Sequence, residues 1–227
     1  MQSQATIIKN ISSERFKPYL EMAEGSISSA IKLYEFNIKI SESFYSSLHN
    51  VEIFLRNNFH SAMMEIYGEK WFLNRNLLAG TSGREFVNIV KVDDIIAKLK
   101  TSNTSDVISN LSFGFWVSLL YPNYEINIWR PALRKIFPSE QKITRKESHQ
   151  KLEIIKLTRN RTAHHEFILN HDLEFYHKVI YEILEYLSPE LVKWTSSLDK
   201  FLEVSRVYED FLAKSNIGRR NLKHKKT

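Results

Sequence analysis

The chain contains no cysteine, and this absence excludes disulfides, thiolate metal sites and cysteine nucleophiles. Glycine and proline are scarce, with 6 and 5 among 227 residues, so long stretches lack the residues that interrupt helices. No run approaches the ~18 consecutive apolar residues of a membrane span, and the first residues lack the basic and apolar segments of a secretory signal. We therefore expect a soluble, cytoplasmic protein without a membrane partner.

The residues that are present favour a folded protein with an anionic partner. Apolar residues make up 43% of the chain, which is enough for a substantial core. The formal net charge is +6, which suits a polyanion because cationic side chains displace counterions from phosphates. Much of this charge lies in the last ten residues, GRRNLKHKKT, which hold five Lys and Arg and no acid. We expect residues 1–213 to form a single helical domain and residues 214–227 a basic, flexible tail.

Helical periodicity runs through most of the chain and predicts an all-α fold. Residues 26–67 contain neither glycine nor proline and repeat apolar residues at helical spacing. They predict one very long helix, or two helices with a small offset, ended by Gly68. A short helix is expected over residues 14–23, with Pro18 either in its first turn or breaking it. Residues 73–86 hold two glycines, both in the segment 79–83, and predict a loop.

The second half of the chain predicts further helices. One is expected over residues 84–99, and one after the N-cap candidates at residues 101–104 that continues to Pro122. A short helical piece is expected over residues 129–137. Three longer helices should cover residues 140–166 (capped by Ser139), 172–187 and 189–213. The whole pattern is that of a helical bundle with one or two very long helices.

The segment KLTRNRTAHHEFIL, residues 156–169, gathers basic and polar residues near a predicted helix end. On one helix Asn160 and His164 are four residues apart, so the amide can hydrogen-bond and orient the imidazole. Arg161 and His165 form a second pair of this kind. Arg159 lies five residues before His164, about 140° around a regular helix. Either the helix loosens here, or a second copy of the chain approaches the same target.

A histidine beside an arginine suits chemistry at a phosphodiester. Arg159 would hold the phosphate and stabilise charge in the transition state, and His164 would move a proton. A structural interpretation is as natural, because basic residues near a helix C-terminus interact favourably with the helix dipole. In that interpretation Glu166 pairs with a cation one turn earlier in the chain.

Other polar and aromatic groups have two interpretations each. His49, Glu52 and Arg56 share one face of the predicted long helix, either as a second wall of a cleft or as a polar network inside a bundle. The histidines around Glu166 lack the spacing of a metal-binding helix, so we expect no metal and no other cofactor. The aromatic cluster could stack RNA bases, although large aromatics more often lie in cores or interfaces. Its members are Phe113, Phe115, Trp116, Tyr121, Tyr124 and Trp129.

The string RNRTAH, residues 159–164, resembles the R-N-x-x-x-H signature of the HEPN superfamily of helical ribonucleases and nucleotide-binding domains. The longer string LTRNRTAHHEFIL resembles the Abi-like proteins of bacterial abortive-infection systems. KLYEFNIKISESFYSSLHNVEIFLRNNFHSAM, residues 32–63, is similar to the family's N-terminal long-helix block. SFGFWVSLL and IWRPALRKIFP are similar to its middle segment. The resemblance covers roughly residues 20–194.

This resemblance implies a HEPN-like helical bundle that pairs as a homodimer and brings two signature motifs into one cleft. It also implies metal-independent cleavage of RNA by attack of the ribose 2′-hydroxyl on the neighbouring phosphate. Arg159 and His164 would be catalytic and Asn160 would position them. Arg161, His165 and Glu166 are secondary candidates for substrate binding, as are His49, Glu52 and Arg56 on the long-helix block.

The family resemblance further implies a role in phage defence or as the toxin of a toxin-antitoxin pair. The expected partners are an RNA substrate, a second copy of the chain and an antitoxin of protein or RNA. Two other functions stay open. The chain could be a non-catalytic RNA-binding or regulatory module, or a nucleotide-binding partner of a nucleotidyltransferase.

Overall fold

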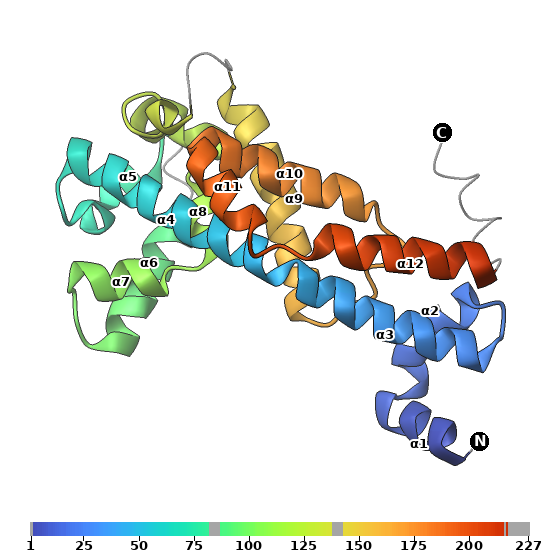
Figure 1. Ribbon diagram of the computed structural model, residues 1–227. Helices are drawn as coiled ribbons and strands as arrows, with labels where there is room; N and C mark the ends of the chain where they lie inside the picture. Colours follow the sequence, from blue (N-terminus) through green and yellow to red (C-terminus); the bar gives the residue numbers. More distant parts are fainter. Residues whose placement is uncertain (1, 82–86, 138–142, 216, 218–227) are drawn as a thin grey trace. The chain divides into compact units, whose positions relative to one another are not determined.

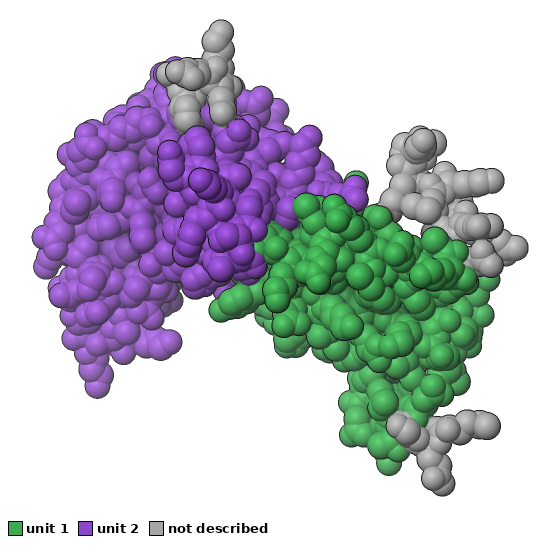
Figure 2. All heavy atoms as spheres, in the orientation of Figure 1, with its two compact units in different colours: residues 1–45, 161–173, 199–227 green, residues 46–160, 174–198 purple. Residues whose placement is uncertain are grey.

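The computed structural model describes residues 2–81, 87–137, 143–215 and 217, and all regular elements in these ranges are helical (Figure 1). The all-α prediction is therefore confirmed. The chain divides into two compact units (Figure 2). Unit 1 comprises residues 1–45, 161–173 and 199–227, and unit 2 comprises residues 46–160 and 174–198. Because both units are discontinuous in sequence, they are not two consecutive domains, and the single-domain organisation stays a prediction.

Unit 1 is built around helix α3 (Ile27–Ser43), against which α2 (Ser13–Met22) and α12 (Phe201–Ser215) pack. Helix α1 (Gln2–Ile11), which the sequence pattern did not predict, precedes α2. Aromatic side chains fill the core between these helices. Phe36 packs on Tyr208 with ring centroids 5.4 Å apart, and Phe44 packs on Phe201 at 4.8 Å.

Helix α2 begins at Ser13 and continues past Pro18, so the prediction that this proline lies in a first turn or breaks the helix is wrong. Proline inside a helix removes one backbone hydrogen bond and costs about 3 kcal/mol. The side chain of Ser12 caps the helix by accepting from the Arg15 N–H. Phe16 and Tyr19 are 3% and 2% exposed, so burial of this face offsets the lost hydrogen bond.

Unit 2 contains most of α4 (Tyr45–Tyr67) and α9 (Arg145–Ala163), together with α10 (Leu173–Leu187) and α11 (Pro189–Ser196). Between α4 and α9 the chain forms several short helices. These are η1 (Trp71–Leu73), α5 (Arg75–Ala79), α6 (Val87–Leu99), α7 (Thr104–Asn110), α8 (Phe113–Ser118), η2 (Pro122–Tyr124), η3 (Glu125–Trp129) and η4 (Leu133–Ile136).

The core of unit 2 is aromatic. Trp71 packs edge-on against Trp116 at 5.9 Å, and Phe115 packs on the same tryptophan at 5.3 Å. Five members of the aromatic cluster are at most 4% exposed, which confirms their interpretation as core residues. They are Phe113, Phe115, Trp116, Tyr124 and Trp129.

Residues 26–67 form two helices, α3 and α4, instead of one long helix. The break is at Phe44, whose side chain is fully buried against Phe201. Gly68 follows the end of α4 with a φ of 81°, a left-handed conformation that glycine adopts without a side-chain clash. The predicted end of the long segment is therefore confirmed.

Two other helix predictions were wrong in their continuity. The helix expected to continue to Pro122 is two helices, because Ser112 caps a new one by accepting from the Phe115 N–H. Residues 129–137 contain the end of a π-helix and a 3₁₀-helix, so the short helical piece expected there is confirmed. The helix expected over 189–213 is interrupted, and Asp199 accepts from the Phe201 N–H to begin α12. Side chains that cap helices thus divide segments that periodicity alone joins.

The predicted loop over 73–86 contains the last residue of η1 and all of α5, so the loop prediction is wrong for residues 75–79, and the side chain of Asn74 caps α5. The predicted helix start at 84 and part of the 79–83 loop lie outside the described residues. The same holds for Ser139 as a cap and for residues 218–227 of the predicted tail. Of the described helices, none combines the length and the apolar character needed to cross a membrane.

Candidate functional site

Arg159 lies on α9 and faces Glu52 on α4, both within unit 2. The Arg159 Nε lies 3.5 Å from the Glu52 Oε2, and their side chains are 44% and 30% exposed. The structure therefore brings together one residue of the signature and one residue of the predicted second wall. An ion pair this exposed contributes at most about 1 kcal/mol. The ion pair with Glu52 by itself therefore adds little to the stability of the folded chain.

The other two residues of the predicted second wall also lie on α4. His49 is exposed and Arg56 is half-buried. The Arg56 Nε donates a hydrogen bond to the Asn57 side chain at 3.2 Å. Because α4 runs without a break from residue 45 to residue 67, His49, Glu52 and Arg56 share one helix as predicted.

Helix α9 ends at Ala163, three residues before the predicted end. His165 has a φ of 56°, and its N–H donates to the Thr162 carbonyl at 3.2 Å. The Glu166 N–H donates to the Arg161 carbonyl at 2.9 Å. These two hydrogen bonds are those of a Schellman motif, which satisfies the carbonyls at a helix C-terminus. His164 and His165 therefore lie in an exposed turn and not on the last turn of the helix.

This early helix end changes the predicted side-chain pairs. Arg161 and His165 no longer share a helical face, so that predicted pair is wrong. The Arg161 Nε instead lies 3.8 Å from the Glu166 Oε2. That contact is the one expected from the structural interpretation of Glu166. The predicted hydrogen bond from Asn160 to His164 joins residues of different units and stays a prediction.

The segment after the turn is bound to α3 by Asn37, a residue that is only 4% exposed. The Asn37 Nδ2 donates to the Glu166 carbonyl at 2.9 Å. Its Oδ1 accepts from the Ile168 N–H at 2.8 Å. One side chain thus satisfies two backbone groups that a buried segment must pair.

Two further contacts within unit 1 fix the same segment. The Arg15 Nη1 donates to the His165 carbonyl at 3.5 Å. Phe167 packs edge-on against Tyr19 with ring centroids 4.8 Å apart. Residues on α2 and α3 therefore determine where the turn with His164 lies in this unit.

The sequence pattern did not point to Asn37, Arg15 or Tyr19. A lone asparagine among the apolar residues of α3 was the only signal for Asn37. Its partners are 129 and 131 residues away, so no local pattern links them.

Two histidines of unit 2 have a lowered pKa, and both lie outside the signature. Burial lowers the pKa of His149, although Glu153 acts in the opposite direction. Burial also lowers the pKa of His60, and the His60 Nδ1 accepts a hydrogen bond from the Trp71 Nε1 at 3.1 Å. A nitrogen that accepts is unprotonated, so this hydrogen bond also favours the neutral imidazole. Within the described ranges, no group of three or more His, Asp or Glu residues is arranged to hold a metal ion.

Comparisons with known families, with curated proteins and with solved structures found no match for this chain.

Proposed function

We propose that this protein is a HEPN-type endoribonuclease of the Abi-like class, which cuts RNA without a metal ion in phage defence or as a toxin. The observation that carries the proposal is the R-N-x-x-x-H string at the C-terminal end of α9. Two features of the described residues support it. Arg159 has a partly exposed guanidinium that faces Glu52, and His164 is exposed in a turn.

The reaction would begin with the ribose 2′-hydroxyl next to the bond that is cut. An imidazole takes the proton from this hydroxyl, and the 2′-oxygen attacks the adjacent phosphorus. The bond from phosphorus to the 5′-oxygen of the next nucleotide breaks, and that oxygen receives a proton. The products are a 2′,3′-cyclic phosphate and a 5′-hydroxyl. His164 is the proton-transfer group in this scheme.

Arg159 would bind the phosphate and stabilise the charge that develops on its oxygens. A guanidinium matches two phosphate oxygens at once and keeps its charge at all physiological pH values. In the free protein Glu52 holds this guanidinium at 3.5 Å. Glu52 would be a positioning residue. Its carboxylate orients Arg159, and this ion pair breaks when the phosphate binds.

The proposal includes a homodimer. Arg159 and His164 are five positions apart in the sequence. In a site formed by two chains, Arg159 of the partner subunit would act with His164 of this chain. Asn160 would position the histidine through its side-chain amide. An antitoxin of protein or RNA would restrain the activity.

The test uses total RNA incubated with purified wild-type protein and with the His164→Ala variant in the presence of EDTA. We expect the wild type to produce fragments with 2′,3′-cyclic phosphate ends. The variant should cut at least about 100-fold more slowly, since general acid-base catalysis contributes that much or more. A His177→Ala variant, which removes a histidine of α10, should cut at the wild-type rate.

Identical RNA profiles with and without wild-type protein would contradict the enzymatic function. If the protein then still binds RNA, the non-catalytic RNA-binding module becomes the better description. Cleavage that EDTA abolishes would contradict the metal-independent mechanism.

A further inference from the structure

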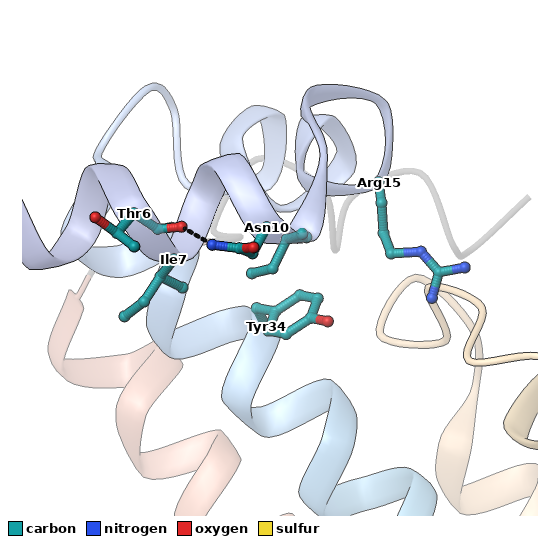
Figure 3. Close-up of a pocket in the computed structure, with 6 residues that line it drawn as sticks. Thr6, Ile7, Asn10, Arg15 and Tyr34 are labelled. Atoms are coloured by element: carbon teal, nitrogen blue, oxygen red, sulfur yellow. Dashed lines mark hydrogen bonds between the residues drawn. The ribbon is translucent and has the colours of Figure 1, made fainter.

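Unit 1 has a groove of about 560 Å³ between α1, α2 and α3 (Figure 3). The ring of Tyr34 lies on the α3 side, and Ile7 and Asn10 lie on the α1 side. Arg15 extends from α2 next to them. The volume of the groove falls within the range of small-molecule pockets, about 300–1,000 Å³. The lining consists of Thr6, Ile7, Asn10, Ile11, Arg15 and Tyr34.

The lining combines the groups that bind an unpaired nucleotide. Tyr34 offers an aromatic face and the two isoleucines offer apolar surface for a base. Arg15 provides a positive charge for a phosphate, and none of the described residues that line the groove is acidic. The Asn10 Nδ2 donates to the Thr6 carbonyl at 2.8 Å, which leaves its amide oxygen as an acceptor.

The ring of Tyr34 is held in place by other aromatic side chains. It packs edge-on against Tyr19 with centroids 5.1 Å apart, and Tyr19 packs on Phe167. A stacking surface that is fixed before binding loses little side-chain entropy when a base arrives. This aromatic series also connects the groove to the segment that follows His165.

Arg15 makes the second connection to that segment. It lines the groove and also donates to the His165 carbonyl at 3.5 Å. An RNA strand with one base in the groove therefore passes its backbone next to the turn that carries His164.

We infer that the α1–α2–α3 groove binds one unpaired nucleotide of an RNA strand, next to the phosphate presented to His164. The base stacks on Tyr34 and the adjoining phosphate pairs with Arg15. The groove then selects single-stranded sites, because a paired base cannot enter it. This inference rests on the proposed function for its substrate, but binding can be measured without cleavage.

The first test locates the nucleotide directly. A single-stranded oligoribonucleotide with 5-bromouridine at each position in turn is bound to full-length His164→Ala protein and irradiated. We expect a cross-link in the tryptic peptide LYEFNIK, residues 33–39, which contains Tyr34. An equal yield with a fully paired duplex, or cross-links only elsewhere in the chain, would overturn the inference.

The second test compares variants in the same His164→Ala background by fluorescence anisotropy. Tyr34→Leu should weaken binding of the oligoribonucleotide about tenfold through lost stacking. Tyr34→Phe should bind within about twofold of the parent, since it keeps the ring. Arg15→Gln should weaken binding and reduce the salt dependence by about one phosphate contact. The matched controls Tyr45→Leu, at a side chain 71% exposed, and Arg206→Gln, at an exposed arginine of α12, should change neither quantity.

The outcomes separate this inference from the proposed function. Cleavage by wild-type protein together with unchanged binding of Tyr34→Leu and Arg15→Gln would overturn the groove alone. A cross-link at Tyr34 without cleavage by the wild type would support the groove and contradict the ribonuclease. The cross-link is measured on a chain whose groove is intact. It therefore tests whether the groove binds a nucleotide even if Tyr34→Leu folds poorly.

Discussion

At the scale of single residues, the backbone of His165 has an unfavourable conformation. Its φ of 56° is a left-handed conformation in which a side chain clashes with the backbone, at a cost of about 1–2 kcal/mol. Histidine tolerates it better than branched residues do, and the two hydrogen bonds of the Schellman motif hold it there. The two adjacent histidines therefore differ in role, since His165 ends the helix and His164 presents an exposed imidazole.

Replacing His165 by glycine should stabilise the protein. Glycine adopts the left-handed conformation without a clash, so the free energy of unfolding should rise by about 0.5–1 kcal/mol. His165→Val should lower it by at least as much, because a branched side chain fits this conformation poorly. Urea unfolding of the three proteins tests this. If RNA cleavage is retained in His165→Gly, the imidazole at this position is not needed for catalysis.

The stability of the protein should fall below about pH 6.5. His60 and His149 have folded-state pKa values below 6.5, chiefly through burial. Below that pH the unfolded chain binds more protons than the folded one, so acid favours unfolding. Below pH 4.5 protonation of the Glu125 carboxylate should lower the stability further. Burial alone would raise the pKa of Glu125, but its bonds to Arg145 and Arg130 outweigh burial and lower it.

Urea unfolding at pH 7.5, 6 and 5 should show this decline. The decline between pH 6.5 and pH 5 should become smaller in His149→Gln and in His60→Gln. A glutamine at 60 can still accept from the Trp71 Nε1, so that variant keeps its hydrogen bond. An unchanged decline in both variants would show that other groups titrate.

At the scale of elements, α9 is defined by backbone and side-chain hydrogen bonds at its ends. At its start, the Thr144 N–H donates to the Glu147 carboxylate, and the Glu147 N–H donates to the Thr144 hydroxyl. This capping box begins the helix, and the Schellman motif at His165 ends it. The sequence T-R-K-E contained the first signal, although the sequence analysis placed the start near 140.

Periodicity predicted that nearly every long segment is helical, and it located the end of α4 at Gly68 and the helix over 172–187 closely. Periodicity could not locate the break between α3 and α4. That break lies at Phe44, whose side chain is buried against Phe201, a residue far away in the sequence. Within the candidate site, Arg161 beside Glu166 follows from local spacing. The contacts of Asn37 do not, since its partners lie 129 and 131 residues away in the irregular segment after α9. Local hydrogen bonds are readable from a sequence, whereas contacts between elements depend on the fold.

Replacing Asn37 should loosen the segment that follows α9. Asn37→Ala leaves the buried Ile168 N–H without its acceptor, which should cost about 1–3 kcal/mol. The amide of Ile168 should then exchange with solvent faster than in the parent protein. Asn110→Ala, at an exposed asparagine that bonds within its own helix, should change neither measurement. Unchanged exchange at Ile168 in Asn37→Ala would show that this side chain does not hold the segment.

At the scale of the whole molecule, the signature residues are distributed over both units of the chain. Arg159 and Asn160 belong to unit 2, and His164 belongs to unit 1, although α9 is continuous across the boundary. The formal net charge of the whole chain is +6, which favours association with a polyanion. The homodimer is the remaining expectation at this scale, and it can be tested without knowing how two copies contact each other.

Mixing two inactive chains should restore activity if the site is shared. An Arg159→Ala chain and a His164→Ala chain are co-expressed with different tags, and heterodimers are purified through both tags. Each heterodimer has one site that combines an intact Arg159 with an intact His164. These should regain up to half of the wild-type rate of RNA cleavage. Each variant alone should stay inactive. Verified heterodimers that remain inactive would indicate that both residues act within one chain.

The bond from Asn37 to Ile168 also has a consequence for the order in which the protein forms during synthesis. The two residues are 131 positions apart, so the turn with His164 is attached to α3 only after the ribosome has made most of the chain. Closing so long a loop comes late in folding, because its entropy must be lost before the contact forms. An incomplete chain released from the ribosome before residue 168 therefore lacks the contact that positions this turn.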